Sequence, residues 1–484
     1  MPYADLRDFL GALAKEGRLL HIADQVAPEP DLAAAAKAAA DLGEAAPALL
    51  FSDIHGYERA RVALNVHGSW AAHAMALGLP PDTPLREQFD EFVRRWDNHP
   101  VPVAHTDEAP FTQHCVEGDD INLFEQLPVF RLNEHDGGFY LDKALIVSRD
   151  PDHPEDFGRQ NTGIYRLQVQ GPRTLGIQPV PVHDIAVHLR LADELGEDLP
   201  VAIALGNEPV ISIVAGMPIP YDASEYEMAG ALQEAPYPVA TAPLTGLDVP
   251  AGAEIVIEGV VLSRTRELEG PFGEFTGYYS GVRRQPVIRV DRVWHRTDPI
   301  FEHLYLGKPW TEIDYMFGIN TGVPIFRELR KDFPEVVSVN ALYTHGLVAV
   351  VSTRQRYGGF GKAVGLRTLT TRHGLGYCKV VIVVDEDVDP YDMAQVMWAV
   401  SARFNPEFDL VTLPRQHGHP LDPSSSPQGM SAKMIIDATA PIAPDLRGTH
   451  AYPVQPPATT SAWAARLRDL LGAERDAPTW MPPL

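Results

Sequence analysis

Segments in which apolar and polar residues alternate dominate the middle third of the chain. The alternation runs through residues 164–169, returns over residues 255–262 and is found again over residues 287–293. Such a pattern places every second side chain on one face of a strand, so it is typical of half-buried strands. Glycine and proline residues separate the segments. Together these features predict an antiparallel sheet that curls into a barrel.

The N-terminal part of the chain mixes helical and strand patterns instead. Apolar residues within residues 6–13 have the i, i+3, i+4, i+7 spacing of an amphipathic helix. A second helix is expected over the alanine-rich residues 33–40, with Asp31 as its cap. A strand is expected over residues 48–51, directly after a proline.

The last third returns to a mixture of strands and helices. A buried strand is expected over residues 380–384 and a helix over residues 392–404. The proline-rich residues 453–457 precede a final helix, with Ser461 as its N-cap and Gly472 as its stop. This helix would dock either on a neighbouring subunit or on its own domain.

Helices over residues 184–195 and 224–233 are expected to interrupt the strand-rich part. The predicted fold class is therefore α/β (α+β), in three parts. Residues 1–110 form an N-terminal α/β region, residues 111–320 the strand-rich domain, and residues 321–484 a C-terminal α/β domain with an oligomerisation tail.

Charge and cysteine content exclude several classes of protein. The 484 residues contain 40 Lys and Arg against 65 Asp and Glu, a net charge of −25. A field of that sign repels nucleic-acid phosphates and anionic lipids, so we expect neither a nucleic-acid nor a membrane partner. Two cysteines cannot build a disulfide framework or a four-cysteine zinc site. With no signal peptide or membrane-length apolar run in the sequence, we expect a cytoplasmic protein.

Two short motifs permit more than one interpretation. A glycine-rich turn ends in Lys362, but Arg356 and Ala363 replace the glycine and hydroxyl residue of a nucleotide-binding phosphate loop. Lys362 could hold another phosphate, or the segment is a plain turn. His417 and His419 have no acidic ligand beside them, so a loop that delivers an imidazole to a pocket is favoured over a zinc site.

Polar groups are concentrated in three segments of the middle third, residues 161–166, 178–184 and 268–279. The last contains Glu269 and Glu274, and the Gly-Pro-Phe-Gly turn between them could aim both carboxylates into one place. Paired carboxylates differ in pKa, so that one can act as a general acid while the other stays ionised. A nearby arginine would hold the ionised one or a substrate carboxylate. The alternative is a hairpin with two solvated glutamates.

Asn161, His183 and Glu225 would together offer oxygen and nitrogen ligands. That set suits Mn²⁺ or Mg²⁺ better than a thiolate-rich zinc site does. No local spacing joins the three residues, so the residues alone leave a metal site as one option.

Several long stretches carry a resemblance to a known family. They are residues 49–52, 161–166, 177–181, 224–230, 269–277, 301–307, 342–347 and 434–439. Over essentially its full length the sequence resembles the UbiD-like decarboxylases, which use prenylated FMN. It is most similar to the large C subunit of the hydroxyarylic (phenolic) acid decarboxylases. The resemblance implies a split β-barrel flavin-binding domain over residues 111–320, flanked by α/β regions and assembled into a dimer or a higher oligomer such as a hexamer.

The resemblance also implies how a cofactor is held. Asn161, His183 and Glu225 match the family's metal ligands, and the metal, usually Mn²⁺ (or Mg²⁺), ties the cofactor phosphate to the protein, often with K⁺ beside it. The positions that match cofactor contacts are Asn161, Ile164, Tyr165, Arg166, Gln178, Pro179, Val180, His183, Asp184, Glu225 and Lys362.

Arg166, Glu269 and Glu274 match the family's catalytic set. Arg166 is expected to position the substrate carboxylate, Glu269 to hold Arg166, and Glu274 to protonate the ring carbon that CO₂ leaves. For a phenolic substrate, His303 and His419 are candidate partners of the ring hydroxyl, and a structural role for each is the alternative.

The implied function is reversible, non-oxidative decarboxylation of a hydroxyaryl carboxylate such as 4-hydroxybenzoate, vanillate or protocatechuate, with CO₂ as a product. The alternatives are the same chemistry on a heteroaromatic acid or a polyprenyl-hydroxybenzoate, or a non-catalytic subunit. A separate flavin prenyltransferase would supply the cofactor, and small accessory subunits are compatible with the resemblance.

Overall fold

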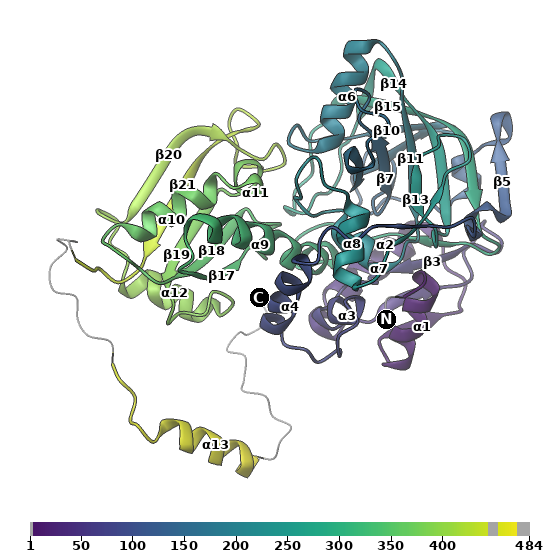
Figure 1. The fold of residues 1–484 in the computed structure, drawn as a ribbon. Helices are drawn as coiled ribbons and strands as arrows, with labels where there is room; N and C mark the ends of the chain where they lie inside the picture. The colour runs from purple at the N-terminus through teal and green to yellow at the C-terminus, as the bar shows by residue number, and fades with distance from the viewer. Residues whose placement is uncertain (1–2, 444–453, 472–484) are drawn as a thin grey trace.

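The computed structural model describes residues 3–443 and 454–471. Figure 1 shows an N-terminal region in purple and blue, a strongly curved middle sheet in teal, and a C-terminal domain in green and yellow to one side. Mixed helices and strands around a curled sheet confirm the predicted fold class.

The N-terminal region builds a four-stranded sheet in the order β1-β2-β3-β16. β2 and β3 are antiparallel, and the outer pairs are parallel. The elements are α1 (Leu6–Lys15), β1 (Leu19–Ile22), a π-helical turn (Pro28–Leu32), α2 (Ala33–Ala40), a 3₁₀ turn (Gly43–Ala45), β2 (Ala48–Phe51), β3 (Arg61–Leu64), α3 (Trp70–Ala76), α4 (Leu85–Trp96) and, from later in the chain, β16 (Ile300–Glu302).

Both predicted N-terminal helices form, but the expected cap of the second is wrong. Asp31 accepts a hydrogen bond from the backbone N–H of Ala27 (2.9 Å) and does not cap α2. The reason is that residues 28–32 already wind into a helical turn that leads directly into α2.

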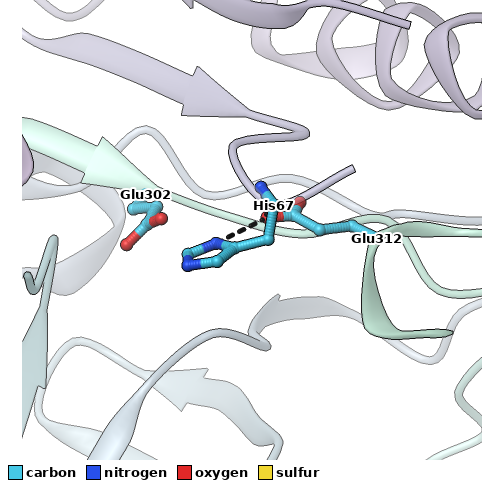
Figure 2. Close-up of side chains that lie close together, drawn as sticks. All are labelled: His67, Glu302 and Glu312. Carbon is cyan, nitrogen blue, oxygen red and sulfur yellow. Dashed lines mark hydrogen bonds and ion pairs between the residues drawn. The ribbon is translucent and has the colours of Figure 1, made fainter. Parts of the chain in front are cut away.

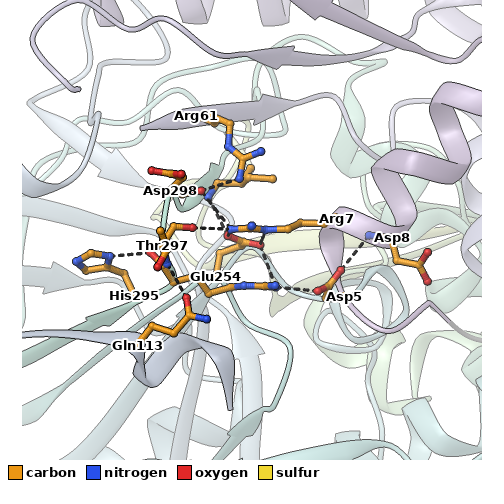
Figure 3. A network of polar contacts seen from close by, with 11 residues as sticks. Asp5, Arg7, Asp8, Arg61, Gln113, Glu254, His295, Thr297 and Asp298 are labelled. Carbon is orange, nitrogen blue, oxygen red and sulfur yellow. Dashed lines mark hydrogen bonds and ion pairs between the residues drawn. The ribbon is translucent and has the colours of Figure 1, made fainter. Parts of the chain in front are cut away.

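A network of charged groups fastens α1 to the middle sheet (Figure 3). The Nε and Nη2 atoms of Arg7 donate to the two carboxylate oxygens of Glu254 (2.6 and 2.7 Å). Arg296 joins Glu254 to Asp5, with Nη1 at 2.7 Å from Asp5 Oδ2. Glu254 is fully buried, so its charge is balanced by the two arginines rather than by water.

The middle sheet has nine strands in the path β6-β9-β10-β15-β14-β11-β7-β8, with β5 paired to β15. All of these pairs are antiparallel, as the alternating pattern predicted. The strands are β5 (His114–Glu117), β6 (Phe139–Leu141), β7 (Leu145–Arg149), β8 (Gln160–Ile164), β9 (Leu167–Gly171), β10 (Thr174–Ile177), β11 (Leu199–Leu205), β14 (Ile255–Glu269) and β15 (Arg283–His295).

Smaller elements complete the middle of the chain. A three-stranded sheet has the order β13-β12-β4. The elements are β4 (Ala104–His105), 3₁₀ turns (Pro110–Gln113, Gly118–Asp120 and Phe157–Arg159), α5 (Leu123–Gln126), α6 (Asp184–Leu195), α7 (Pro209–Val214), α8 (Glu225–Gln233), β12 (Pro238–Thr241) and β13 (Asp248–Pro250). α6 has the predicted bounds, and Gly196 ends it in the left-handed conformation (φ +76°).

The expected continuous strand over residues 164–169 is wrong. The chain leaves β8 at Ile164 and re-enters the sheet as β9 at Leu167. β8 lies at one end of the strand path and β9 is next to the other end. Tyr165 and Arg166 therefore cross the opening of the curled nine-stranded sheet, which we call the half-barrel. Both are buried although they belong to no strand.

The C-terminal domain is a five-stranded sheet, in the order β17-β18-β19-β21-β20, with helices on its faces. Its elements are α9 (Glu312–Asp332), β17 (Val336–Asn340), β18 (Val348–Thr353), α10 (Phe360–Leu369), α11 (Arg372–Gly376), β19 (Val380–Asp385), α12 (Met393–Ala402), β20 (Leu410–His417), β21 (Met430–Ala438) and α13 (Thr460–Leu471). The buried strand predicted over residues 380–384 is confirmed as β19.

The last described helix, α13, begins at Thr460, so Ser461 lies inside it and is not its N-cap. Gly472, its predicted stop, lies outside the described residues. Trp463 and Leu467 are about half exposed. Within residues 3–443 and 454–471, no helix is both long and apolar enough to cross a membrane.

Candidate active site

The break between β8 and β9 brings Arg166 against two buried glutamates. Arg166 Nε and Nη2 donate to the two carboxylate oxygens of Glu269 (2.9 and 2.7 Å), and Nη1 donates to Glu274. Phe272, from the turn between the glutamates, lies 5.0 Å from the guanidinium. The two carboxylates therefore share one arginine, and the alternative of a hairpin with solvated glutamates is wrong.

Burial raises the pKa of Glu274, although the positive charge of Arg166 acts in the opposite direction. A raised pKa favours the protonated carboxyl, the form that a general acid needs. Glu269 is held at both oxygens by the guanidinium, a bidentate geometry that fixes the orientation of the arginine.

A second cluster lies at the other end of β8. Glu225, the first residue of α8, accepts the backbone N–H of Thr162 (3.1 Å), and Asn161 Oδ1 accepts the hydroxyl of Tyr165 (3.2 Å). His183 Nε2 is 2.9 Å from the hydroxyl of Tyr377. Asn161, His183 and Glu225, distant in sequence, line one cavity.

This cluster has the properties of a metal-binding site. His183 Nδ1 is buried and finds no hydrogen-bond partner in the described part of the chain. Burial lowers the pKa of His183 to about 4, so the imidazole is neutral and can act as a ligand. Burial also raises the pKa of Glu225 to about 8, and the nearby negative charge of Asp184 acts in the same direction. A divalent cation would satisfy both groups, and the donor set fits Mn²⁺ or Mg²⁺.

The two clusters are joined by adjoining cavities between the half-barrel and the C-terminal domain. The cavity beside Glu225 has a volume of about 130 Å³ and the cavity beside Glu274 about 110 Å³. Both are lined by Ile164, Tyr165, His183, Phe317, His345 and Tyr377. The candidate metal site and the Arg166 group therefore belong to one continuous site.

Other predicted site residues are divided between this site and its surroundings. Gln178, Val180 and His419 line the cavity beside Glu274, and Asp184 lines the cavity beside Glu225. Pro179 instead lines an outer groove against α6.

The structure does not bring Lys362 to the site. It lies on α10, where its Nζ is 3.8 Å from Asp409 Oδ1, and it lines neither cavity. The glycine-rich turn that precedes it begins a helix packed on the C-terminal sheet, which keeps the ammonium away from the half-barrel.

His303 does not line the cavity, so direct contact with a substrate hydroxyl is not supported. It is fully buried, with Nδ1 paired to Asp142 and Nε2 3.1 Å from the backbone oxygen of Tyr140. Both ring nitrogens are thus occupied by the protein itself.

Sequence reasoning named His419 but missed the rest of the aromatic wall that the C-terminal domain contributes. The ring of Tyr377 lies 4.5 Å from those of His373 and His419 and 5.0 Å from that of His345. Burial lowers the pKa of His345 and His419 to about 3, so both rings are neutral. Thr344 and His345 have positive φ values (49° and 52°), which no sequence pattern predicts for residues of these types.

A separate buried group resembles a metal site but already contains a cation. His67, Glu302 and Glu312 place their ligand atoms within 4.8 Å of one another (Figure 2). Lys143 Nζ lies 2.6 Å from a carboxylate oxygen of each glutamate and 3.0 Å from His67 Nδ1. The ammonium therefore occupies the position that a metal ion would need.

Comparisons with known proteins agree with this architecture. Residues 10–92, 103–309 and 314–438 match the N-terminal, Rift-related and C-terminal domain models of 3-octaprenyl-4-hydroxybenzoate carboxy-lyase. The phenolic acid decarboxylases of Escherichia coli O157:H7 and Bacillus subtilis (strain 168) are 59% and 58% identical, covering 98% and 97% of this chain and 100% of each relative.

Solved structures give the same result. The vanillic acid decarboxylase of Sedimentibacter hydroxybenzoicus in its closed form superposes with a TM-score of 0.93 at 48% identity, over 97% of this chain and 99% of that one. Its open form gives 0.86 at 48% identity, over 97% and 100%. The UbiD-class enzyme HmfF of Pelotomaculum thermopropionicum in complex with FMN gives 0.80 at 30% identity, over 95% and 98%.

The fold and these matches define a carboxy-lyase. The chain belongs to the UbiD family, which confirms the resemblance inferred from its motifs.

Proposed function

We propose that this protein catalyses the reversible, non-oxidative decarboxylation of hydroxyaryl carboxylates of the 4-hydroxybenzoate, vanillate or protocatechuate type. The observation that carries the proposal is the buried group of Arg166, Glu269 and Glu274 beside a small, largely apolar cavity. The names of the relatives, phenolic and vanillic acid decarboxylases, support this substrate class.

The cofactor in this proposal is prenylated FMN, bound together with Mn²⁺ or Mg²⁺ and, as a further part of the proposal, K⁺. HmfF structures in complex with FMN and with prFMN support the flavin. Asn161, His183 and Glu225 would hold the metal, and the flavin would lie along residues 164–166. When bound, the prenylated flavin provides an acceptor for the electrons that the departing carboxylate leaves behind.

The protein supplies binding, orientation and a proton. Three N–H groups of Arg166 are used by the two glutamates, and its remaining N–H groups would bind the substrate carboxylate. Glu269 acts as the positioning residue for Arg166. Glu274, protonated, would donate its proton to the ring carbon from which CO₂ departs.

The size of the cavity favours a single aromatic ring. Its volume of about 110 Å³ is of the order of the roughly 150 Å³ engineered cavity that binds benzene. Phe272, Phe275, Leu306 and Ile313 are among its walls and would contact a ring on its apolar faces. A polyprenyl-hydroxybenzoate would need a much longer channel, so it is the less favoured substrate.

The assembly and location of the enzyme are also part of this proposal. A flavin prenyltransferase would supply the cofactor, the exposed Trp463 and Leu467 of α13 would mediate homo-oligomerisation, and the enzyme would act in the cytoplasm. In this proposal residues 111–320 form the flavin-binding domain. It is flanked by an N-terminal α/β region (residues 1–110) and by a C-terminal α/β domain with the oligomerisation tail (residues 321–484).

The test is to co-express the chain with a flavin prenyltransferase and to incubate it anaerobically in D₂O with 4-hydroxybenzoate, vanillate, protocatechuate and pyrrole-2-carboxylate. Mass spectrometry should show loss of CO₂ and gain of one carbon-bound deuterium for the hydroxyaryl acids. Turnover of pyrrole-2-carboxylate alone would keep the chemistry and change the substrate class. No turnover by the cofactor-loaded chain, alone or with an accessory subunit, would contradict the proposal.

A further inference from the structure

The cavity beside Glu274 contains a second buried carboxylate, Asp142, which has no role in the mechanism above. It follows β6 directly and lines the same cavity as Arg166 and Glu274. Its side chain is fully buried, and its Oδ2 atom has no hydrogen-bond partner among residues 3–443 and 454–471. An unsatisfied carboxylate oxygen in such a place is costly unless a ligand satisfies it.

The other oxygen of Asp142 is firmly held. Asp142 Oδ1 accepts the backbone N–H of Leu304 (3.2 Å) and is paired with Nδ1 of His303. Burial raises the pKa of Asp142, and these two contacts act in the opposite direction and favour the carboxylate. His303 is itself fixed by the backbone oxygen of Tyr140 and by the ring of Phe130, whose centroid lies 4.4 Å from its own. The direction of the free oxygen is therefore set by contacts behind the cavity wall.

The residues next to Asp142 and His303 anchor the same two segments of the chain. Lys143, next to Asp142, pairs with Glu302, next to His303 (2.6 Å). The Asp142–His303 contact and the Lys143–Glu302 ion pair thus join consecutive residues on one segment to consecutive residues on the other. Because all four side chains are buried, this double pairing resists displacement of Asp142.

We propose that Asp142 Oδ2 accepts a hydrogen bond from the ring hydroxyl of a phenolic carboxylate bound in this cavity, with His303 as the positioning residue. This inference rests on the proposed function and identifies the group that selects hydroxylated rings. It also replaces direct contact by His303 with an action through Asp142.

The chemistry of the substrate gives the contact a second effect. A hydroxyl that donates to a carboxylate gains phenolate character and releases electron density into the ring. Ring carbons para and ortho to it become better proton acceptors, which helps Glu274 to protonate the carbon that loses CO₂. No net proton transfer to Asp142 is required.

The test measures binding without turnover. Calorimetry on the cofactor-loaded enzyme would compare 4-hydroxybenzenesulfonate with benzenesulfonate, because a sulfonate cannot lose CO₂. The wild type should bind the hydroxylated ligand about 10- to 100-fold more tightly, the range for a hydrogen bond to a charged group. Asp142→Asn should reduce this preference to within about threefold, while the affinity for benzenesulfonate stays unchanged.

Two further variants separate positioning from structure. His303→Asn should reduce the preference, and adding it to Asp142→Asn should reduce it no further, because both act on one contact. Asp314→Asn is the matched control, since Asp314 is a buried carboxylate that caps α9 and lines neither cavity. It should leave the preference unchanged.

An unchanged preference in Asp142→Asn, or an equal loss of affinity for both sulfonates, would overturn the inference. Vanillate turnover by the same preparations keeps the two proposals distinguishable. Lost turnover with an intact hydroxyl preference would contradict only the proposed function. Turnover by a wild type without hydroxyl preference would contradict only the role of Asp142.

Discussion

Arg166 and Glu269 form a bidentate ion pair in which Nε and Nη2 of the guanidinium donate to both carboxylate oxygens (2.9 and 2.7 Å). The pair joins the barrel opening to the end of β14, and the remaining nitrogen of Arg166 donates to Glu274. One guanidinium therefore fixes both the carboxylate that orients it and the carboxylate proposed as the acid.

Replacing this arginine by lysine should disable the site without unfolding the protein. Arg166→Lys keeps the positive charge, but a single ammonium cannot reproduce the fork that engages two glutamates. We expect kcat/KM for vanillate to fall by about 100-fold or more, the effect of a lost bidentate, charge-assisted contact. Circular dichroism and the flavin spectrum should remain those of the wild type. A kcat/KM of Arg166→Lys within a factor of about two of the wild-type value would show that the bidentate contact is unnecessary.

Glu274→Gln should remove the proton donor and leave cofactor binding intact. Turnover should fall by about 10²- to 10⁴-fold, the usual contribution of a general acid. The matched control is Glu267→Gln, an exposed glutamate on β14 close to Glu269, which should retain wild-type activity. Deuterium incorporation in D₂O measures the effect. Persistent turnover by Glu274→Gln would reassign the acid.

His183→Ala should lower the metal content of the purified holoenzyme. Nδ1 of His183 has no hydrogen-bond partner within residues 3–443 and 454–471 and is the proposed ligand. Its loss should reduce bound metal by about tenfold or more and weaken flavin retention, in line with roughly 10- to 100-fold effects in metal sites. His188→Asn is the control, because His188 is a buried histidine on α6 whose Nδ1 contacts Ser148. Elemental analysis and flavin absorbance provide the readout. Equal metal loss in both variants would argue against His183.

Lys143→Ala should destabilise the protein and create a metal site. Loss of the ammonium leaves Glu302 and Glu312 buried without a counter-charge, at a cost of about 3–5 kcal/mol. Added Zn²⁺ should then raise the thermal midpoint of the variant but not that of the wild type, because His67 and the two glutamates already converge. A Lys143→Ala protein that Zn²⁺ does not stabilise would contradict this interpretation.

Stability should depend on pH through His73. Burial lowers the pKa of this histidine to about 4 in the folded protein, although Gln88 hydrogen-bonds its ring (2.8 Å). The unfolded chain takes up a proton near pH 6.5 and the folded chain does not, so stability falls as the pH drops from 6.5 to 4. The difference amounts to about 3 kcal/mol. Thermal midpoints from pH 7.5 to 5 should fall less steeply in His73→Gln, and parallel profiles would contradict the assignment.

Local sequence patterns predicted the regular elements well. Residues 184–195 form a helix with the expected bounds because an apolar stripe and a following glycine define both ends. The prediction of one strand over residues 164–169 failed, because alternation of apolar and polar residues continues unchanged across a two-residue break. A tertiary contact interrupts the strand, because Arg166 turns toward two glutamates about a hundred residues away in the sequence.

The candidate site was predictable only in part. Glu269 and Glu274 stand out because a short turn links them, and Asn161, His183 and Glu225 depended on the family resemblance. Asp142 was missed because it stands beside Lys143, and a charged pair between two apolar segments is typical of an exposed turn rather than of buried side chains. For His303 the sequence left both a contact with the substrate hydroxyl and a structural role open, and only the structure shows that it is paired with Asp142 and does not line the cavity.

The short path from Asn161 to Arg166 has a consequence for the cofactor. These residues are five positions apart, and an extended chain spans at most about 3.3–3.6 Å per residue. The distance between the proposed phosphate anchor and the reacting centre is therefore limited by covalent bonds within one segment. The half-barrel alone therefore sets the length of a cofactor that can fit between these two points.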